Sequence, residues 1–238
     1  MTSRPDRHGA PDMSTKAGFA DTRRFTQLSL FTGNAISTDW PFGDLKPMSF
    51  GVIMADPPWP FSNWSKKGEG RNASQHYRTM SLEEIMALPV GSLAARDCAL
   101  FLWCTGPLTN RIDDIMRAWG FSFKGKAFCW AKLNPRAATR PTDNIADNSN
   151  WFMSLGYGTR HNTEDCWLGT IGSPKRQAKD VRELIVAPVR EHSRKPDEAF
   201  TRAERLFPGP YLELFSRQSR PGWSVFGDEV GKFDERAA

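Results

Sequence analysis

Short apolar segments recur along the chain, separated by polar and amphipathic stretches. Seven of them predict β-strands, at residues 50–55, 98–104, 121–131, 164–171, 184–189, 211–215 and 223–227. Several are continuously apolar instead of alternating with polar residues, which is typical of strands covered on both faces. The first run must end at Asp56, because two prolines follow it and proline cannot donate a hydrogen bond to a sheet.

Apolar residues at helical spacing lie between these runs. They predict three helices: one that opens after Ser81, one over 106–119 and one over 196–207. Glu84 forms a capping box with Ser81, and Pro89 ends this helix. Pro196 takes the first helical position of the last segment. Alternating strands and helices predict an α/β fold with a mostly parallel sheet and helices on both faces. In such sheets ligands bind beyond the carboxyl ends of the strands, where Asp56 stands.

The composition suits one domain with a polar arm. The chain has 238 residues, of which 39% are hydrophobic, and this is enough for one core. We therefore expect a single domain over residues 27–238. Residues 1–26 are rich in Arg, Asp, Thr, Ser, Gly and Pro, which predicts a mobile basic arm. The formal net charge of +5 and the pI of about 9.1 permit an anionic partner without requiring one.

Several protein classes are disfavoured by the sequence. No segment approaches the roughly 18–20 apolar residues of a membrane span, and the polar N-terminus lacks the apolar region of a secretory signal. The cysteines form no C-x-x-C pair, and the histidines show no metal-ligand spacing. We therefore expect a cytoplasmic protein with reduced thiols and no bound metal. Whether it is a monomer or a homodimer is open.

Two polar segments, residues 62–75 and 132–150, are long for loops inside a compact domain. Each follows a predicted strand, so both should lie at the same edge of the sheet as Asp56. Besides Lys132 at the end of the predicted strand, they carry five basic residues: Lys66, Lys67, Arg71, Arg136 and Arg140. These side chains either contact nucleic-acid phosphates or keep a loop solvated, and the sequence does not decide between the two.

The stretch Asp56-Pro57-Pro58-Trp59 has a specific chemistry. The Asp56 carboxylate only accepts hydrogen bonds, and the Pro57 carbonyl is a second acceptor on a backbone with two fixed φ angles. Two acceptors at a fixed separation suit an exocyclic NH₂ group, whose nitrogen lone pair then points away from its ring toward an electrophile. Trp59 offers a face for that ring, a contact worth roughly 1–3 kcal/mol for a base, and Tyr77 can close the other face. A base in a duplex must first leave its stack. Taken alone, these residues equally suit a strand-ending turn with a buried tryptophan.

Further motifs follow in a fixed order. They are His76-Tyr77-Arg78-Thr79-Met80, Phe128-Cys129-Trp130-Ala131-Lys132, Ser193-Arg194-Lys195-Pro196-Asp197-Glu198, Glu213-Leu214-Phe215 and Gly227-Asp228-Glu229. The whole series, over about residues 36–232, closely resembles the adenine-N6 methyltransferases related to the seventy-kilodalton catalytic subunit of the eukaryotic mRNA adenosine methyltransferase. The resemblance implies a Rossmann-like fold that binds S-adenosylmethionine. It also implies a permuted motif order, in which the target-amine motif comes early and the methionine-end motif comes late.

The resemblance implies roles for individual residues. The catalytic set is Asp56, Pro57, Pro58, Trp59 and Tyr77. The set that contacts S-adenosylmethionine, or its product S-adenosylhomocysteine, is Asp39, Asp56, Lys195, Glu213, Phe215, Arg217, Asp228 and Glu229. Arg190 matches a basic residue near the substrate phosphate. The chain departs from the mRNA enzyme at Ser219 and Arg220, which replace a histidine and an asparagine near the cofactor.

Three functions remain in view. The compact length is similar to the bacterial and phage branch of the family, whose members mostly modify DNA, so the leading hypothesis is methyl transfer to the N6 amine of adenine in DNA. The second is the same reaction on adenosine in RNA, since the amine and the ring are identical. The third is a non-catalytic nucleic-acid-binding subunit, which the intact Asp-Pro-Pro-Trp motif disfavours.

Overall fold

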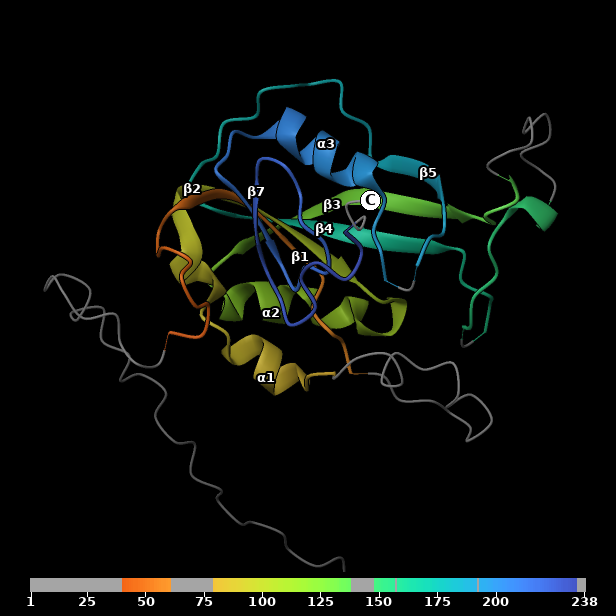
Figure 1. The fold of residues 1–238 in the computed structure, drawn as a ribbon, viewed down its shortest axis with the longest axis horizontal. Coiled ribbons are helices and arrows are strands. Elements are labelled where there is room, and N and C mark those ends of the chain that lie inside the picture. Colours follow the sequence, from red (N-terminus) through yellow and green to blue (C-terminus); the bar gives the residue numbers. More distant parts are fainter. Residues whose placement is uncertain (1–39, 61–78, 138–147, 157, 192, 235–238) are drawn as a thin grey trace, which may run out of the picture. The chain divides into compact units, whose positions relative to one another are not determined.

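The computed structural model describes residues 40–60, 79–137, 148–156, 158–191 and 193–234 (Figure 1). The chain divides into two units, Met1–Trp40 and Pro41–Ala238, and the fold described below belongs to the second. The expected arm, residues 1–26, lies outside the described residues, so its boundary stays a prediction. Within the described ranges, no helix is long and apolar enough to cross a membrane.

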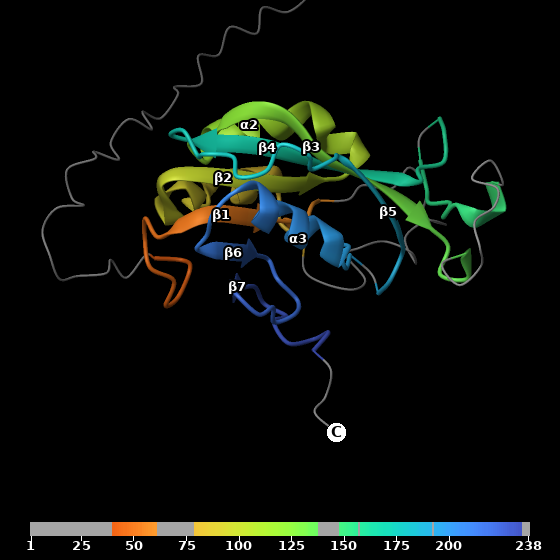
Figure 2. The same ribbon diagram turned by 90° about the horizontal axis from the view of Figure 1, so that it is seen from above.

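The described residues form one seven-stranded sheet in the order β5-β3-β4-β2-β1-β6-β7. Its strands are β1 Phe50–Ala55, β2 Ala94–Cys104, β3 Ser122–Leu133, β4 Thr163–Ile171, β5 Leu184–Pro188, β6 Tyr211–Leu214 and β7 Trp223–Phe226. Figure 2 shows β4, β2, β1, β6 and β7 following one another across the sheet. All seven predicted strands are confirmed. β4 runs antiparallel to β2 and β3, and the remaining neighbours are parallel, so the sheet is mostly parallel as expected.

Helices cover both faces of the sheet. Figure 1 shows α3 (Asp197–Leu206) on one face and α1 (Leu82–Ala87) with α2 (Ile112–Ala118) on the other. β1 is buried along its whole length, because it lies inside the sheet between these layers. Val52 and Met54 belong to the hydrophobic cluster that contains Phe200 of α3. Strand residues alternate between faces, so Asp56 continues the row of Val52 and Met54 on the α3 face.

The first two predicted helices differ in how well they match the structure. The capping box of α1 is confirmed: the Glu84 amide donates to Ser81 Oγ at 3.1 Å, and the Ser81 amide donates to a Glu84 carboxylate oxygen at 2.7 Å. The expected continuous helix over 106–119 is wrong in its first half, because Gly106–Arg111 form a 3-10 helix before α2 begins. Glycine, threonine and asparagine in this half are weak helix formers, which favours the shorter, tighter turns.

The start of α3 also differs from the expectation. Pro196 does not take the first helical position; its backbone is extended, with φ −64° and ψ 137°, and it caps the helix. Its carbonyl accepts a hydrogen bond from the Ala199 amide at 3.1 Å, as a capping residue does. Asp197 is therefore the first residue of α3, and Lys195 lies two residues before it.

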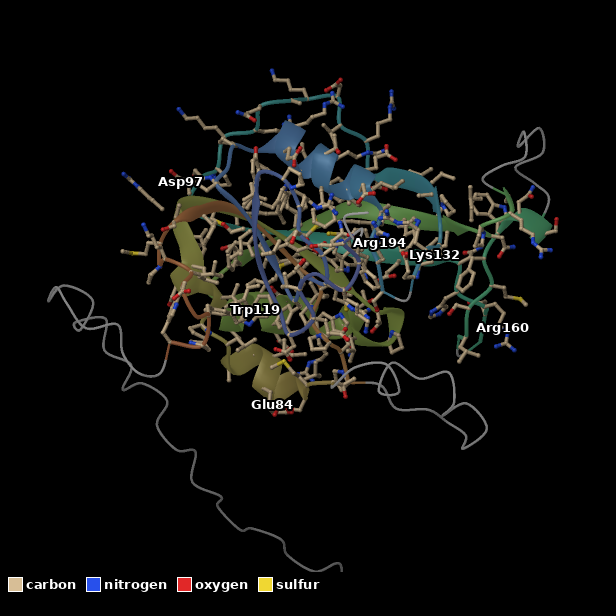
Figure 3. All side chains as sticks on the ribbon, viewed as in Figure 1. Glu84, Asp97, Trp119, Lys132, Arg160 and Arg194 are labelled. Carbon is tan, nitrogen blue, oxygen red and sulfur yellow. The ribbon has the colours of Figure 1, made fainter. Side chains whose placement is uncertain are left out.

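The carboxyl ends of β1 and β6 lie side by side. Ala55 pairs with Leu214, so Asp56 and Phe215 leave the sheet next to each other. The strand order reverses at β1, with β2 on one side and β6 on the other, and α/β sheets bind ligands at such a point. Because β4 is antiparallel, its amino end reaches this same edge. In Figure 3, Lys132 lies toward this edge, near the end of β3, and Asp97 lies at the opposite end of the sheet.

Candidate active site

A cavity of about 520 Å³ opens beyond the carboxyl ends of β1 and β6. Its walls come from the turn after β1, the segment before α3, and the chain from β6 to the segment that follows β7. Seven residues of the expected cofactor set line it: Asp56, Lys195, Glu213, Phe215, Arg217, Asp228 and Glu229. Apolar lining comes from Pro41, Phe42, Met80, Leu88 and Phe226, among others. The structure therefore brings together residues that lie up to 173 positions apart, from Asp56 to Glu229.

The turn after β1 is fixed by backbone hydrogen bonds. The Trp59 amide donates to the Pro57 carbonyl at 2.8 Å, and the Met80 amide donates to the Pro58 carbonyl at 2.9 Å. Asp56 and Pro58 face the cavity. Trp59 is 4% exposed and does not line the cavity, so its contact with a base stays a prediction. One lone pair of the Pro57 oxygen is thus engaged, and a carbonyl oxygen has a second one to offer.

Lys195 joins two carboxylates beside this turn. Its ammonium lies 2.5 Å from Asp56 Oδ2 and 2.9 Å from Glu164 Oε1, and its side chain is 7% exposed. The same ammonium lies over the ring of Trp103, 5.5 Å from the centroid. The other carboxylate oxygen of Glu164 lies 2.7 Å from Lys132 Nζ. Four charges therefore alternate in sign from β3 to β1, and we call them the charge row: Lys132, Glu164, Lys195 and Asp56.

The two carboxylates of the charge row differ in acidity. Burial raises the pKa of Asp56; Lys195 opposes this rise, and the negative charge of Glu164 adds to it. Burial also acts to raise the pKa of Glu164, but Lys195 and Lys132 together outweigh it and bring the pKa down to about 2. Burial disfavours the charged form of Lys195, yet Asp56 and Glu164 hold its pKa above the ordinary value. Lys195 is therefore a cation, and Glu164 is the more strongly ionised of its two partners.

Glu213 forms a further acidic group at the cavity. Its Oε2 atom is buried and has no hydrogen-bond partner among the described residues. Burial raises the pKa of Glu213 to about 7, although the nearby positive charge of Arg220 opposes the rise. A buried carboxylate oxygen without a donor is uncommon in proteins, and at a cavity wall it suits a ligand that brings a positive charge or a donor.

The chain after β6 forms the opposite wall of the cavity. Phe215 has a left-handed backbone, with φ +62°, which is rare for a residue with a side chain and is often found at ligand sites. Arg217 Nε lies 2.7 Å from Glu229 Oε2, so the segments after β6 and after β7 are joined by an ion pair. Gly227 leaves no room for a side chain, because a Cβ atom there would lie 2.4 Å from the Ser216 carbonyl oxygen.

Comparison with known proteins identifies the family. Residues 50–229, which are more than half of the chain, match the family described as MT-A70. The chain belongs to the MT-A70 family. This confirms the resemblance inferred from the motif series, and the α/β sheet with covered faces agrees with the Rossmann-like methyltransferase fold expected of it.

Three methyltransferases from different organisms resemble the chain over different shares of their length. The type II methyltransferase M.MunI of a Mycoplasma species is 32% identical over 213 residues, which are 81% of this chain and 82% of that protein. An N(6)-adenosine-methyltransferase MT-A70-like protein of Arabidopsis thaliana is 32% identical over 185 residues, 76% of this chain and 24% of the relative. The human N(6)-adenosine-methyltransferase catalytic subunit METTL3 is 31% identical over 186 residues, 76% of this chain and 28% of the relative. The chain thus spans most of the bacterial relative and about a quarter of the plant and human ones.

Other expected site residues of this MT-A70 chain lie elsewhere or outside the described ranges. Arg190 does not line the cavity; its guanidinium contacts Asp197 and the Lys195 carbonyl. Arg136 is exposed just after β3. Tyr77, Asp39, Lys66, Lys67, Arg71 and Arg140 lie outside the described residues. The proposed contacts of all these side chains with nucleic acid or cofactor stay predictions.

Glu164 is a site residue that sequence reasoning missed. It stands near the start of an apolar run, and in a parallel sheet the start of a strand lies at the edge away from the ligand. β4 is antiparallel, so Glu164 instead reaches the carboxyl ends of the other strands, where it pairs with Trp130 of β3. The available signal was the polar stretch at 161–165, which leads directly into the strand and ends in two acidic residues.

Proposed function

We propose that this protein transfers a methyl group from S-adenosylmethionine to the N6 amine of adenine in DNA. The proposal rests on the position of Asp56. A rigid proline turn holds this residue at the rim of the cavity of about 520 Å³, at the point where the strand order reverses and β1 pairs with β6. The similarity to M.MunI over most of both chains supports DNA as the substrate.

The lining of the cavity fits S-adenosylmethionine, which carries a sulfonium cation, an amino-acid end, a ribose and an adenine. Glu213 Oε2 and Gln218 Oε1 are buried acceptors without hydrogen-bond partners among the described residues, and they suit cationic or N–H groups. The carboxylates of Asp228 and Glu229 suit ribose hydroxyls. The volume lies within the range of small-molecule sites, about 300–1,000 Å³. When bound, the cofactor supplies an electrophilic methyl group.

The residues of the turn then orient the amine. Lys195 donates to Asp56 Oδ2, so one amine hydrogen goes to Asp56 Oδ1 and the other to the second lone pair of the Pro57 carbonyl. This arrangement directs the nitrogen lone pair into the cavity, and it contributes by orientation and electrostatics. After transfer the nitrogen has one proton too many. Asp56 is the nearest acceptor, and its raised pKa suits it to receive that proton.

The same reaction on RNA is the alternative. It is supported by the similarity to the plant and human N(6)-adenosine-methyltransferases, although the chain matches only about a quarter of their length. The described cysteines are free thiols, which supports the proposed cytoplasmic location. Monomer and homodimer both stay open.

Transfer of labelled methyl to matched DNA and RNA oligonucleotides, single- and double-stranded, tests the proposal. We expect label in N6-methyldeoxyadenosine with the natural protein, and a loss of about 100-fold or more in Asp56→Asn. Asp180→Asn, which removes an exposed ion pair with Arg205, is the matched control and should transfer normally. Label only in RNA would select the alternative. No label in either polymer, with S-adenosylhomocysteine still bound, would point to a non-catalytic subunit.

A further inference from the structure

Asp197, the first residue of α3, is held by two arginines from different parts of the chain. Arg190 Nη1 donates to Asp197 Oδ2 at 2.7 Å, and Arg220 Nη2 donates to Asp197 Oδ1 at 3.0 Å. Arg190 precedes α3, whereas Arg220 lies between β6 and β7 and lines the cavity. We call these three residues the arginine clasp.

The clasp is connected to Lys195 through the backbone. Arg190 Nη2 donates to the Lys195 carbonyl oxygen at 2.5 Å, so one guanidinium holds both the Asp197 side chain and the main chain of Lys195. A planar guanidinium can bind two acceptors in one fixed geometry, which a lysine ammonium cannot reproduce. The clasp therefore sets the position from which the Lys195 side chain extends to Asp56.

Arg220 anchors the other side of the clasp. Its guanidinium lies 3.6 Å from the centroid of the Phe200 ring, and Phe200 is buried in the core one turn further along α3. The stacked ring fixes the plane of the guanidinium, and a cation over an aromatic face is attracted to it. The wall of the cavity after β6 is thereby joined to the segment that carries Lys195.

We propose that the arginine clasp is a positioning device: Asp197, Arg190 and Arg220 hold the Lys195 backbone so that its ammonium stays between Asp56 and Glu164. The inference rests on the proposed function, since it gives Lys195 a role in orienting Asp56 toward the amine. It also assigns Arg190 to an internal contact, in place of the substrate phosphate to which the sequence pointed.

A double-mutant cycle with Lys195→Met separates positioning from a merely structural role. If the clasp acts through Lys195, Asp197→Asn should lower kcat/KM about 10- to 100-fold in the natural background, the size of loss that a small misplacement of an active-site group causes. In the Lys195→Met background the same substitution should lower it less than about 2-fold, because coupled residues are not additive. Arg190→Lys should behave like Asp197→Asn, because lysine keeps the positive charge but lacks the planar guanidinium that binds both the Asp197 side chain and the Lys195 carbonyl.

Glu198→Gln is the matched control, because it neutralises the adjacent carboxylate in the same turn of α3, which pairs with Arg202 instead. It should keep the natural kcat/KM. Thermal unfolding of every variant shows whether the fold is retained. Equal losses from Asp197→Asn in both backgrounds, or no loss in either, would overturn the proposal.

The affinity for S-adenosylhomocysteine, measured by calorimetry, gives a readout that needs no nucleic acid. If the natural protein methylates no oligonucleotide, that result alone contradicts the proposed function. The double-mutant cycle can then still be evaluated from the affinity for S-adenosylhomocysteine in place of kcat/KM. A coupled loss of affinity would still support the clasp, and an additive loss would reject it.

Discussion

Removing the charge of Glu164 tests the reasoning about the charge row most directly. Glu164 lies between two lysines and its side chain is only 14% exposed. Glu164→Gln keeps the shape and leaves a neutral amide facing both ammonium groups. Lys195 then has Asp56 as its remaining carboxylate, and Lys132 loses its ionic partner in the charge row.

The magnitude follows from the pKa of Glu164, which falls from 4.5 to about 2 on folding. Each pKa unit corresponds to about 1.4 kcal/mol, so the ionised carboxylate stabilises the native state by about 3 kcal/mol. The folded pKa lies below the unfolded one. The ionised Glu164 therefore contributes its full stabilisation above about pH 4.5, and this stabilisation is lost progressively as the pH falls from about 4.5 through about 2. Between pH 7 and pH 3 the loss amounts to about 2 kcal/mol.

Chemical denaturation at a series of pH values measures this contribution. Glu164→Gln should have a free energy of unfolding about 3 kcal/mol below that of the natural protein at pH 7, and this gap should narrow as the pH falls below about 4.5. Glu198→Gln, which breaks an ion pair on the exposed side of α3, should show little change at any pH. Equal stability at pH 7, or a gap that does not depend on pH, would refute the account of the charge row.

Three further outcomes are expected. Asp56→Asn should lose about 100-fold or more of its transfer rate while its affinity for S-adenosylhomocysteine, measured by calorimetry, stays within a few-fold of the natural protein. The pKa of Glu213 is raised to about 7, so the free energy of unfolding falls as the pH rises from about 4.5 through 7. Glu213→Gln should remove this part of the pH dependence in denaturant titrations, and at pH 8 the variant should be more stable than the natural protein. Gly227→Ala should weaken S-adenosylhomocysteine binding and lower the melting temperature, because the new Cβ would meet the Ser216 carbonyl at 2.4 Å; natural affinity and melting temperature would contradict the close packing of this wall.

The strands were predictable because strands buried on both faces consist mainly of consecutive apolar residues. β1 is apolar throughout and is buried throughout, so its existence and its end at Asp56 follow from the sequence. The first residues of β2 were missed, since Arg96 and Asp97 are exposed and break the apolar run although they belong to the strand. The 3-10 helix at Gly106–Arg111 was missed because apolar spacing alone does not separate it from an α-helix.

The site was predictable in its residues but not in their connections. The motif series named the residues that line the cavity, because a family resemblance transfers roles position by position. It did not indicate that Arg190 contacts Asp197 and the Lys195 carbonyl, since an ion pair between a loop and the start of a helix leaves no periodic pattern in the sequence. The family resemblance placed Arg190 near the substrate phosphate, and an arginine before a helix suits a phosphate contact as well as an internal one.

The direction of β4 decides the electrostatics of the whole edge. If β4 were parallel, Glu164 would lie at the far edge of the sheet, and Lys195 would face Asp56 as a simple pair. With β4 antiparallel, the charge row holds two lysines and two carboxylates, so its formal charges cancel.

Glu213 stands beside this balanced row with a pKa of about 7, so it is close to half protonated at neutral pH. A cationic ligand that enters the cavity then favours the ionised form of Glu213 and gains a carboxylate partner, while Asp56 keeps Lys195. In the proposed reaction the two acidic groups therefore have different roles, since Glu213 would meet the positive charge of the incoming ligand and Asp56 would stay available for the amine.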